Sequence, residues 1–239
     1  MKFRTLMTGL ALALLAWPAF ADQTLLLRQP ALSQDHLAFV YAGDIWISDW
    51  SGQNARRLTS GPATEDTPVF SPDGSMIAVR AGYENNNDVY VMPVAGGQPQ
   101  RLTWHPGRDT PQGWSADGKE VFFVSARETD HGRSGQLFSV SVDGGFPAKQ
   151  MEARIVQGSF SDAGELAYII FIPGYNGLFG FSAGWKGYGG GTAPEINVMD
   201  AAKKAVTTVP GEGSTNFNPF WLDGQVYFLS DREDKLFKL

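Results

Sequence analysis

The sequence of 239 residues contains no cysteine. A chain without thiols forms no disulfide, has no cysteine nucleophile and offers no thiolate ligand for zinc. It also has no cysteine that would carry a lipid at a processed N-terminus, so a lipid anchor is not expected. Packing and hydrogen bonds must therefore supply the stability of the fold.

Histidine is scarce as well, with only His36, His105 and His131 in the chain. No two have the close spacing of a zinc site, and solvated loop histidines are favoured over members of a catalytic triad. The run Asn85-Asn86-Asn87-Asp88 lacks the acidic ligands of a calcium loop. Gly189-Gly190-Gly191 lacks the lysine and helix of a phosphate loop. The sequence predicts no metal and no cofactor.

Positive charge is also limited, because 19 Lys and Arg stand against 25 Asp and Glu. Two of the basic residues, Lys2 and Arg4, belong to a predicted leader; without them 17 basic residues remain, for a net charge of −8. A surface that binds nucleic acid or anionic membranes needs a basic patch. Neither partner is expected.

The one long apolar run lies at the N-terminus. Lys2 and Arg4 precede the apolar stretch Leu6–Leu15, and Ala19-Phe20-Ala21 provides the small side chains that signal peptidase reads. The stretch is shorter than the ~20 residues needed to cross a bilayer, so a membrane anchor is the weaker interpretation. The prediction is a signal peptide over residues 1–21, cleaved after Ala21, and a periplasmic or secreted product.

What the sequence does have is an internal repeat in which an aromatic residue and a serine precede a glycine. Counted from its first residue, the repeat predicts blades starting near residues 32, 70, 114, 160 and 220, at intervals of 38, 44, 46 and 60 residues. The clear copies are Phe70-Ser71-Pro72-Asp73-Gly74, Trp114-Ser115-Ala116-Asp117-Gly118 and Phe160-Ser161-Asp162-Ala163-Gly164, with looser forms at Phe220 and Leu32.

The segments between these turns read as antiparallel strands. Asp44-Ile45-Trp46-Ile47 and Asp88-Val89-Tyr90-Val91 are typical strand sequences, and Arg57-Leu58-Thr59 and Arg101-Leu102-Thr103 close the first two units. About four strands per 40–50 residues is the pattern of a propeller blade. The prediction is an all-β fold, a β-propeller of four-stranded antiparallel blades over residues 22–239. It contains about four blades and part of a fifth, as an incomplete six-bladed ring.

A long insertion, Pro173–Pro194, interrupts the fourth unit. It is rich in glycine and aromatic residues, and loops of this length are usually functional or flexible. One interpretation is that the insertion merely covers the adjacent blade; the other is that it contacts a peptide or partner. The candidate contact residues are Tyr175, Trp185, Lys186 and Tyr188.

One segment matches a catalytic motif by pattern. Gly180-Phe181-Ser182-Ala183-Gly184 fits the Gly-x-Ser-x-Gly elbow of hydrolases. That motif presents its serine at a turn between a strand and a helix, whereas the glycine-rich segment that follows here does not form a helix. Ser182 is therefore not assigned as a nucleophile, and no catalytic residue is predicted in this chain.

The repeats resemble the propeller repeats of TolB-type periplasmic proteins and tricorn-type proteases. Leu37–Trp46 and Asn86–Pro93 are similar to the start of the first propeller of tricorn-type proteases. Trp185–Ile196 resembles the insertion in that family's fourth blade, and Tyr227–Arg232 resembles a later segment. Gly187 and Gly189 depart from the family pattern, where arginines are expected.

The resemblance implies a larger parent protein with two propellers, a PDZ-like domain and a C-terminal serine peptidase domain that assembles as a homo-oligomer. In that family the propellers are thought to filter peptides that enter or leave the protease chamber, and the catalytic residues belong to later domains. The expected partners are peptides or unfolded polypeptide and the remaining peptidase domains. The alternatives are a TolB-like scaffold that binds envelope proteins, or a non-functional remnant.

Overall fold

The computed structural model describes residues 26–129, 135–170, 194–200, 205–211 and 214–232. Within these ranges the fold is built from antiparallel strands, and the sole helical element is one 3-10 turn, Tyr83–Asn85. None of these segments contains a helix long and apolar enough to cross a membrane. The predicted leader and the insertion lie outside the described residues, apart from Pro194 at the insertion's end.

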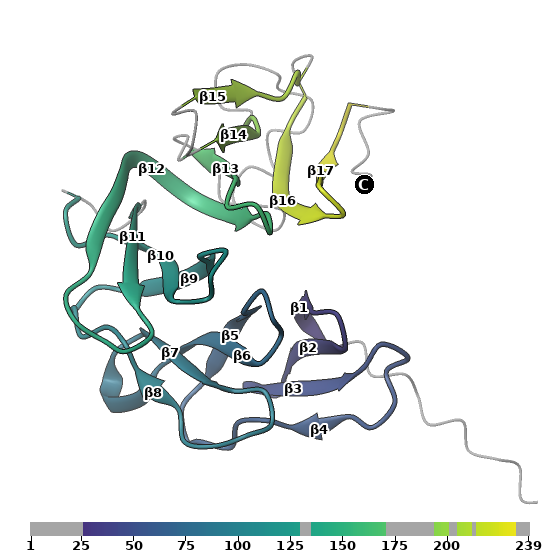
Figure 1. The fold of residues 1–239 in the computed structure, drawn as a ribbon, viewed down its shortest axis with the longest axis vertical. Helices are drawn as coiled ribbons and strands as arrows, with labels where there is room; N and C mark the ends of the chain where they lie inside the picture. The colour runs from purple at the N-terminus through teal and green to yellow at the C-terminus, as the bar shows by residue number, and fades with distance from the viewer. Residues whose placement is uncertain (1–25, 130–134, 171–193, 201–204, 212–213, 233–239) are drawn as a thin grey trace, which may run out of the picture.

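The strands form five consecutive units (Figure 1), which we number as blades 1 to 5. Blade 1 contains β1 (Arg28–Leu32), β2 (His36–Tyr41), β3 (Asp44–Asp49) and β4 (Arg56–Arg57). Blade 2 contains β5 (Glu65–Phe70), β6 (Met76–Ala81), β7 (Asp88–Pro93) and β8 (Gln100–Arg101). Blades 3 and 4 share one seven-stranded sheet of β9 (Asp109–Trp114), β10 (Glu120–Ser125), β11 (Gly135–Ser141), β12 (Ala148–Phe160), β13 (Leu166–Ile170), β14 (Asn197–Asp200) and β15 (Ala205–Thr208). Blade 5 is represented by the hairpin of β16 (Asn216–Leu222) and β17 (Gln225–Ser230).

The first strands begin a few residues before the predicted blade starts, because each motif lies at or near the end of a first strand. Phe70 ends β5 and Trp114 ends β9, so these sheets begin at Glu65 and Asp109. The motif glycine supplies the turn into the second strand; Gly74, for example, has φ of 69°. Asp73 accepts hydrogen bonds from both neighbouring serines, which lower the pKa of its carboxyl to about 2. The repeat therefore marks the first hairpin of a blade rather than its start.

Blades 3 and 4 are joined without a loop. The first part of β12 pairs with β11, where Met151 faces Leu137, and the second part pairs with β13, where Phe160 faces Leu166. One continuous strand of 13 residues is thus both the outermost strand of blade 3 and the innermost strand of blade 4. The fourth strand of blade 3 is therefore not a separate element.

Each apolar core lies between two neighbouring blades. Side chains alternate between the two faces of a strand, so Ile77 and Val79 of β6 pack against blade 1 while Ala78 packs towards blade 3. Further cores of the same kind join blade 3 to blade 4 and blade 4 to blade 5. A blade is therefore stabilised chiefly by its neighbours.

Hydrogen bonds also link the innermost strands from one blade to the next. They involve side chains that reach a neighbouring strand rather than the ordinary ladder of a sheet. The four links are Thr67 N–H to Gln29 Oε1 (3.0 Å), Trp114 Nε1 to Val69 O (2.9 Å), Gly158 N–H to Gln112 Oε1 (2.7 Å) and Trp221 N–H to Ser159 Oγ (3.3 Å). They hold successive first strands around a common axis.

The two ends of the described arc expose apolar side chains. Figure 1 shows β1 and β17 at its opposite ends. Leu32 of β1 is 49% exposed, and Phe220 and Leu222 of β16 are 38% and 42% exposed. Within the arc, the corresponding faces of the blades are covered by the next blade. The two end faces therefore have the composition of a blade–blade contact, but no described blade covers them.

The contact of Gly113 with Phe160 provides a test of blade packing. A Cβ atom at Gly113 would lie 2.5 Å from the Phe160 ring, which itself stacks on Phe122 at 4.4 Å between centroids. We expect Gly113→Ala to lower the free energy of unfolding by about 1–3 kcal/mol in urea titrations, because Phe160 must move. In a Phe160→Ala background the same substitution should cost clearly less; an equal cost in both backgrounds would rule out this contact as the cause.

Candidate functional site

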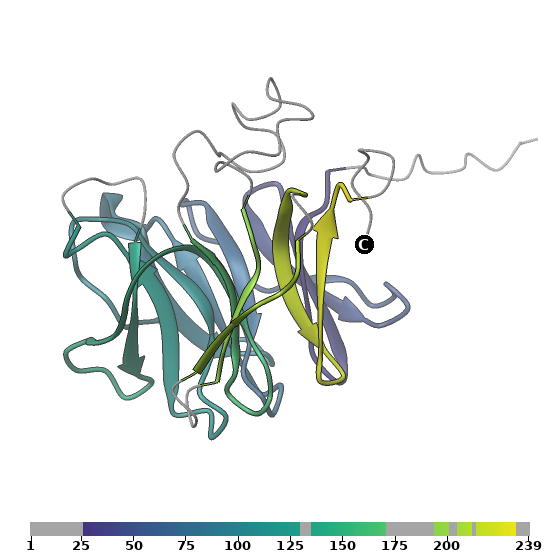
Figure 2. The ribbon, with the colours of Figure 1, turned by 90° about the horizontal axis from the view of Figure 1, so that it is seen from above.

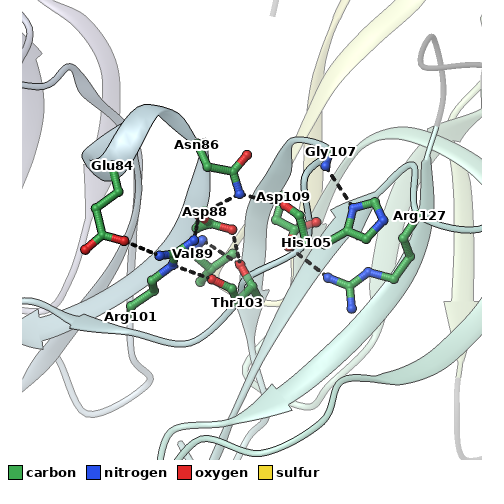
Figure 3. Close-up of polar contacts among 10 residues, drawn as sticks. All are labelled: Glu84, Asn86, Asp88, Val89, Arg101, Thr103, His105, Gly107, Asp109 and Arg127. Atoms are coloured by element: carbon green, nitrogen blue, oxygen red, sulfur yellow. Dashed lines mark hydrogen bonds and ion pairs between the residues drawn. The ribbon is translucent and has the colours of Figure 1, made fainter.

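Polar side chains converge at one end of the blades. Figure 2 shows the strands running between two ends of the molecule, and the second strand of a blade ends where its third begins. The outermost strand also ends there, beside the start of the next blade. We call the group drawn in Figure 3 the strand-end cluster; it includes Glu84, Asn86, Asp88, Arg101, Thr103, His105, Asp109 and Arg127.

The cluster in blade 2 centres on Asp88, a fully buried carboxylate at the start of β7. The Arg101 guanidinium donates to Asp88 Oδ2 at 2.7 Å and to Glu84 Oε2 at 2.8 Å. The Thr103 hydroxyl accepts the N–H of Val89 at 3.0 Å and donates to Asp88 Oδ1 at 3.2 Å. These contacts hold the short outer strand β8, which has only two residues, against β7.

Blade 1 repeats the arrangement. Arg57 pairs with Asp44 at 2.7 Å, and Thr59 accepts the N–H of Ile45 at 2.9 Å. The aspartate and arginine are 13 residues apart in both blades. The strand openings and the Arg-Leu-Thr closings both repeat in the sequence. The sequence alone does not show that the aspartate of an opening meets the arginine of the closing.

A second set of contacts holds the start of three inner strands, β5, β9 and β16. In three blades, a side chain that follows the second strand reaches back to the first polar residue of the blade. The pairs are Tyr83 with Glu65 (2.7 Å), Arg127 with Asp109 (2.8 Å) and Arg232 with Asn216 (3.4 Å). The same position thus uses a phenol or a guanidinium according to the blade.

Arg127 is a largely enclosed side chain, with 15% of its surface exposed. Its guanidinium lies 5.1 Å and 5.0 Å from the ring centroids of Phe123 and Phe138, and its Nε donates to Ser125 Oγ at 3.0 Å. Asp109 is fully buried, and its Oδ1 atom has no hydrogen-bond partner among the described residues. Among the described residues, Arg127 is thus the side chain that pairs with this buried carboxylate.

Burial also changes the acidity of the neighbouring carboxyls. It raises the pKa of Glu65 above its ordinary value of 4.5, against hydrogen bonds from Tyr83 and Thr59 that act to lower it. Burial likewise raises the pKa of Asp88, although the positive charge of Arg101 opposes this. The hydrogen-bond donors to Glu65 are neutral hydroxyl groups, whereas Asp88 is paired with the positively charged guanidinium of Arg101.

The contacts favour a structural role for the cluster over acid–base chemistry. Asp88 and Asp109 are committed to arginines, and the Nδ1 atom of His105 accepts the N–H of Gly107 at 2.9 Å. His36 lies in blade 1, so the structure does not bring these two histidines together. Across the described ranges, no group of three His, Cys, Asp or Glu side chains is placed to hold a metal ion.

The predicted contact residues lie outside the described residues. This applies to Tyr175, Trp185, Lys186 and Tyr188, to Ser182 of the Gly-x-Ser-x-Gly segment and to His131. The insertion connects β13 to β14, a second strand to a third. By topology, Ile170 and Pro194 are thus at the same end of the blades as the strand-end cluster.

The raised pKa of Glu65 predicts a pH-dependent effect of Glu65→Gln. A carboxyl with a raised folded-state pKa binds its proton more tightly in the folded state, so it lowers stability as pH rises through that pKa. The free energy of unfolding of E65Q relative to wild type should therefore increase from pH 4 to pH 8, measured by urea unfolding. Glu152→Gln is the control, because its side chain is 81% exposed; parallel pH profiles for both variants would contradict the prediction.

The Arg127–Asp109 pair predicts a large effect of Arg127→Met. The variant leaves a buried carboxylate without its partner, so we expect a loss of about 3–5 kcal/mol in the free energy of unfolding. Asp109→Asn should recover part of this loss in the double variant. Lys149→Met removes exposed ion pairs with Glu128 and Glu152 and should cost at most about 1 kcal/mol. An equally small cost for R127M would refute the assignment.

Comparisons with known proteins agree with this architecture. The family described as "Tricorn protease N-terminal beta propeller domain" matches residues 24–238. Tricorn protease homolog 1 of Streptomyces coelicolor is 29% identical over 209 residues, which cover 87% of this chain and 19% of that protein. The chain spans about a fifth of the length of the curated relatives that it matches first.

Two solved structures have a similar fold. The crystal structure of the tricorn protease has a TM-score of 0.68 and 22% identity, covering 87% of this chain and 20% of that chain. A putative TolB from Agrobacterium tumefaciens has a TM-score of 0.65 and 20% identity, covering 87% of this chain and 71% of that chain. These confirm the predicted all-β propeller fold. Because the family match extends over nearly the whole sequence, the chain belongs to the family of tricorn protease N-terminal β-propeller domains.

Proposed function

We propose that this chain is the substrate-admitting propeller of a larger secreted tricorn-like serine peptidase and is not catalytic by itself. The observation that carries the proposal is the extent of the family match. Residues 24–238 match the N-terminal propeller, while the chain corresponds to only 19% of a tricorn protease homologue. In this proposal the peptidase chemistry belongs to domains outside this sequence.

The geometry of the blades is consistent with a propeller that contacts the substrate while other domains carry out the hydrolysis. The buried carboxylates of the strand-end cluster are engaged by arginine and threonine side chains, which makes them supports for the loops rather than reacting groups. Rigidly held loops at one end of a propeller are suited to contacting a peptide. The partners in this proposal are peptides or unfolded polypeptide, the remaining peptidase domains and further copies in a homo-oligomer.

The proposed location is the periplasm or the cell exterior. It follows from the leader sequence, with cleavage after Ala21. The acidic balance of the remaining chain is consistent with a soluble protein that binds neither nucleic acid nor anionic lipid.

A TolB-like scaffold is the second candidate function. It is supported by the similarity to a putative TolB, 71% of whose chain is covered by this one. A scaffold would bind envelope proteins through the propeller without any associated hydrolysis. The two proposals therefore predict different masses for the native protein and a different reactivity towards serine-directed probes.

The test is to isolate the native protein from its own cells with an antibody to the propeller. We expect a species several times heavier than 24 kDa, the rough mass of 218 residues at ~110 Da each, because this chain corresponds to only 19% of the Streptomyces coelicolor relative. Its N-terminal residue should be Asp22, and it should react with a fluorophosphonate probe and hydrolyse unfolded polypeptide.

A contrary result has a clear meaning. A species whose mass corresponds to residues 22–239 alone, unreactive with the probe and co-purifying with envelope proteins, would refute the peptidase proposal and favour the scaffold. A precipitate with an unrelated antibody provides the control for non-specific capture.

A further inference from the structure

The outermost strand of each complete blade has one edge that pairs with no other described strand. In blades 1 and 2 this strand has only two residues and contains arginine. In blade 3 it is the first part of β12, which carries Lys149, Glu152 and Arg154. Short strands and charged side chains keep an exposed edge from pairing with another chain. These three outer edges are therefore protected.

The outermost strand of blade 4, β15, lacks this protection. It reads Ala205-Val206-Thr207-Thr208 and contains no charged residue. All four residues are exposed, and Val206 is 54% exposed. The strand is the last of its sheet and lies on the outside of the arc (Figure 1). Because β-branched residues favour the extended conformation, this edge is suited to the addition of a further strand.

The register of the sheet shows which backbone groups of β15 face outward. The N–H of Val209 donates to the carbonyl of Ile196 at 2.8 Å, and the pairing of β15 with β14 continues in the same register. In an antiparallel pair, residues that bond to the neighbouring strand alternate with residues that do not. Thr207 therefore bonds to β14, while the N–H and C=O groups of Val206 and Thr208 point away from it.

We infer that β15 is a self-association edge, at which β15 of a second copy pairs antiparallel across a two-fold axis. Val206 of one copy then lies opposite the partner's Thr208, and each such pair exchanges two N–H···O=C bonds. The axis passes between the two copies of Thr207. The pairing is self-consistent, because both members of each hydrogen-bonded pair have outward-facing backbone groups.

The composition of the strand favours a second copy as the occupant. A strand without charge meets its own copy without like-charge repulsion, and pairs of β-branched residues stabilise antiparallel sheets. Strand β4 or β8, paired with itself, would instead bring arginines together. The inference rests on the proposed function, because it names a surface for the proposed association of copies. A four-residue edge is short against the roughly 1,200 Å² that a stable interface buries, so it contributes to a larger interface.

The absence of cysteine from this sequence makes the register testable by cross-linking. In the inferred pairing, the two copies of residue 207 form a non-hydrogen-bonded pair with Cα atoms about 4.5 Å apart, which suits a disulfide. The two copies of residue 206 are ~8 Å apart, which is too far for one. We therefore expect Thr207→Cys, in the full protein as its cells produce it, to form a disulfide between two copies of residue 207 under mild oxidation.

Mass spectrometry of the linked peptides identifies the product. Val206→Cys is the matched control, because it places the same thiol one residue away on the same edge. Phe146→Cys controls for random collisions, because Phe146 is fully exposed in the turn between β11 and β12. The yield of self-linked peptide should be about tenfold higher for T207C than for either control.

A proline tests the backbone bonds directly. V206P removes one outward N–H from each copy and leaves the bonds of Thr207 to β14, and edge strands tolerate proline. In the T207C background, V206P should lower the yield of the disulfide about tenfold. V206T is the control, because it keeps both the N–H and a β-branched side chain, and it should not lower the yield.

The contrary outcomes separate the inference from the proposed function. If T207C links no better than V206C and F146C, the inference is overturned. A disulfide from residue 207 to a different protein would also overturn it, in favour of a foreign partner strand. A native protein that is oligomeric and reacts with the fluorophosphonate probe, but lacks this cross-link, would leave the proposed function standing. A monomeric native protein would overturn the inference together with the proposed homo-oligomer, while serine reactivity tests the peptidase proposal separately.

Discussion

The burial of both faces of each blade is the constraint on which the rest of the structure depends. A sheet with alternating apolar residues has two sides that water disfavours, and here each side is covered by the next blade in the chain. Ile77 and Ala78 are adjacent in sequence yet belong to different cores. The arc of blades follows from this requirement, as do the exposed apolar residues of β1 and β16 at its ends.

Stacked blades bring polar strand ends together, and the fold must then satisfy them. Asp88 and Asp109 are fully buried carboxylates, which are costly unless they are paired. Arg101 and Arg127 provide the pairing, and the same contacts anchor the loops that follow the outer strands. Stability and the presentation of loops are therefore coupled at this end of the propeller. A polar network of this kind is compatible with a binding face, because Asp88 and Asp109 are already paired with arginines and the adjoining loops are held by these contacts.

Much of the fold was predictable from local patterns. The strands around Ile45 and Val89 and the glycine turns lie where the sequence indicated, because period-two alternation and positive-φ glycines are local properties. The first strands begin a few residues before the predicted blade starts, since the motif belongs to a turn. The continuous strand β12 was missed because it lacks a turn signal. The prolines of the inner strands, such as Pro68, are a further sequence signal for first strands, because they accompany the bulges of these strands. The candidate residues in the insertion stay predictions.

The sequence by itself determined the class of fold, the turn positions and the family, because these depend on spacing along the chain. Only the tertiary structure decided which charges meet. Asp88 and Arg101 lie 13 residues apart, and Asp109 and Arg127 lie 18 apart. No local rule joins residues at such separations; they meet because antiparallel strands return the chain to the same end of the blade.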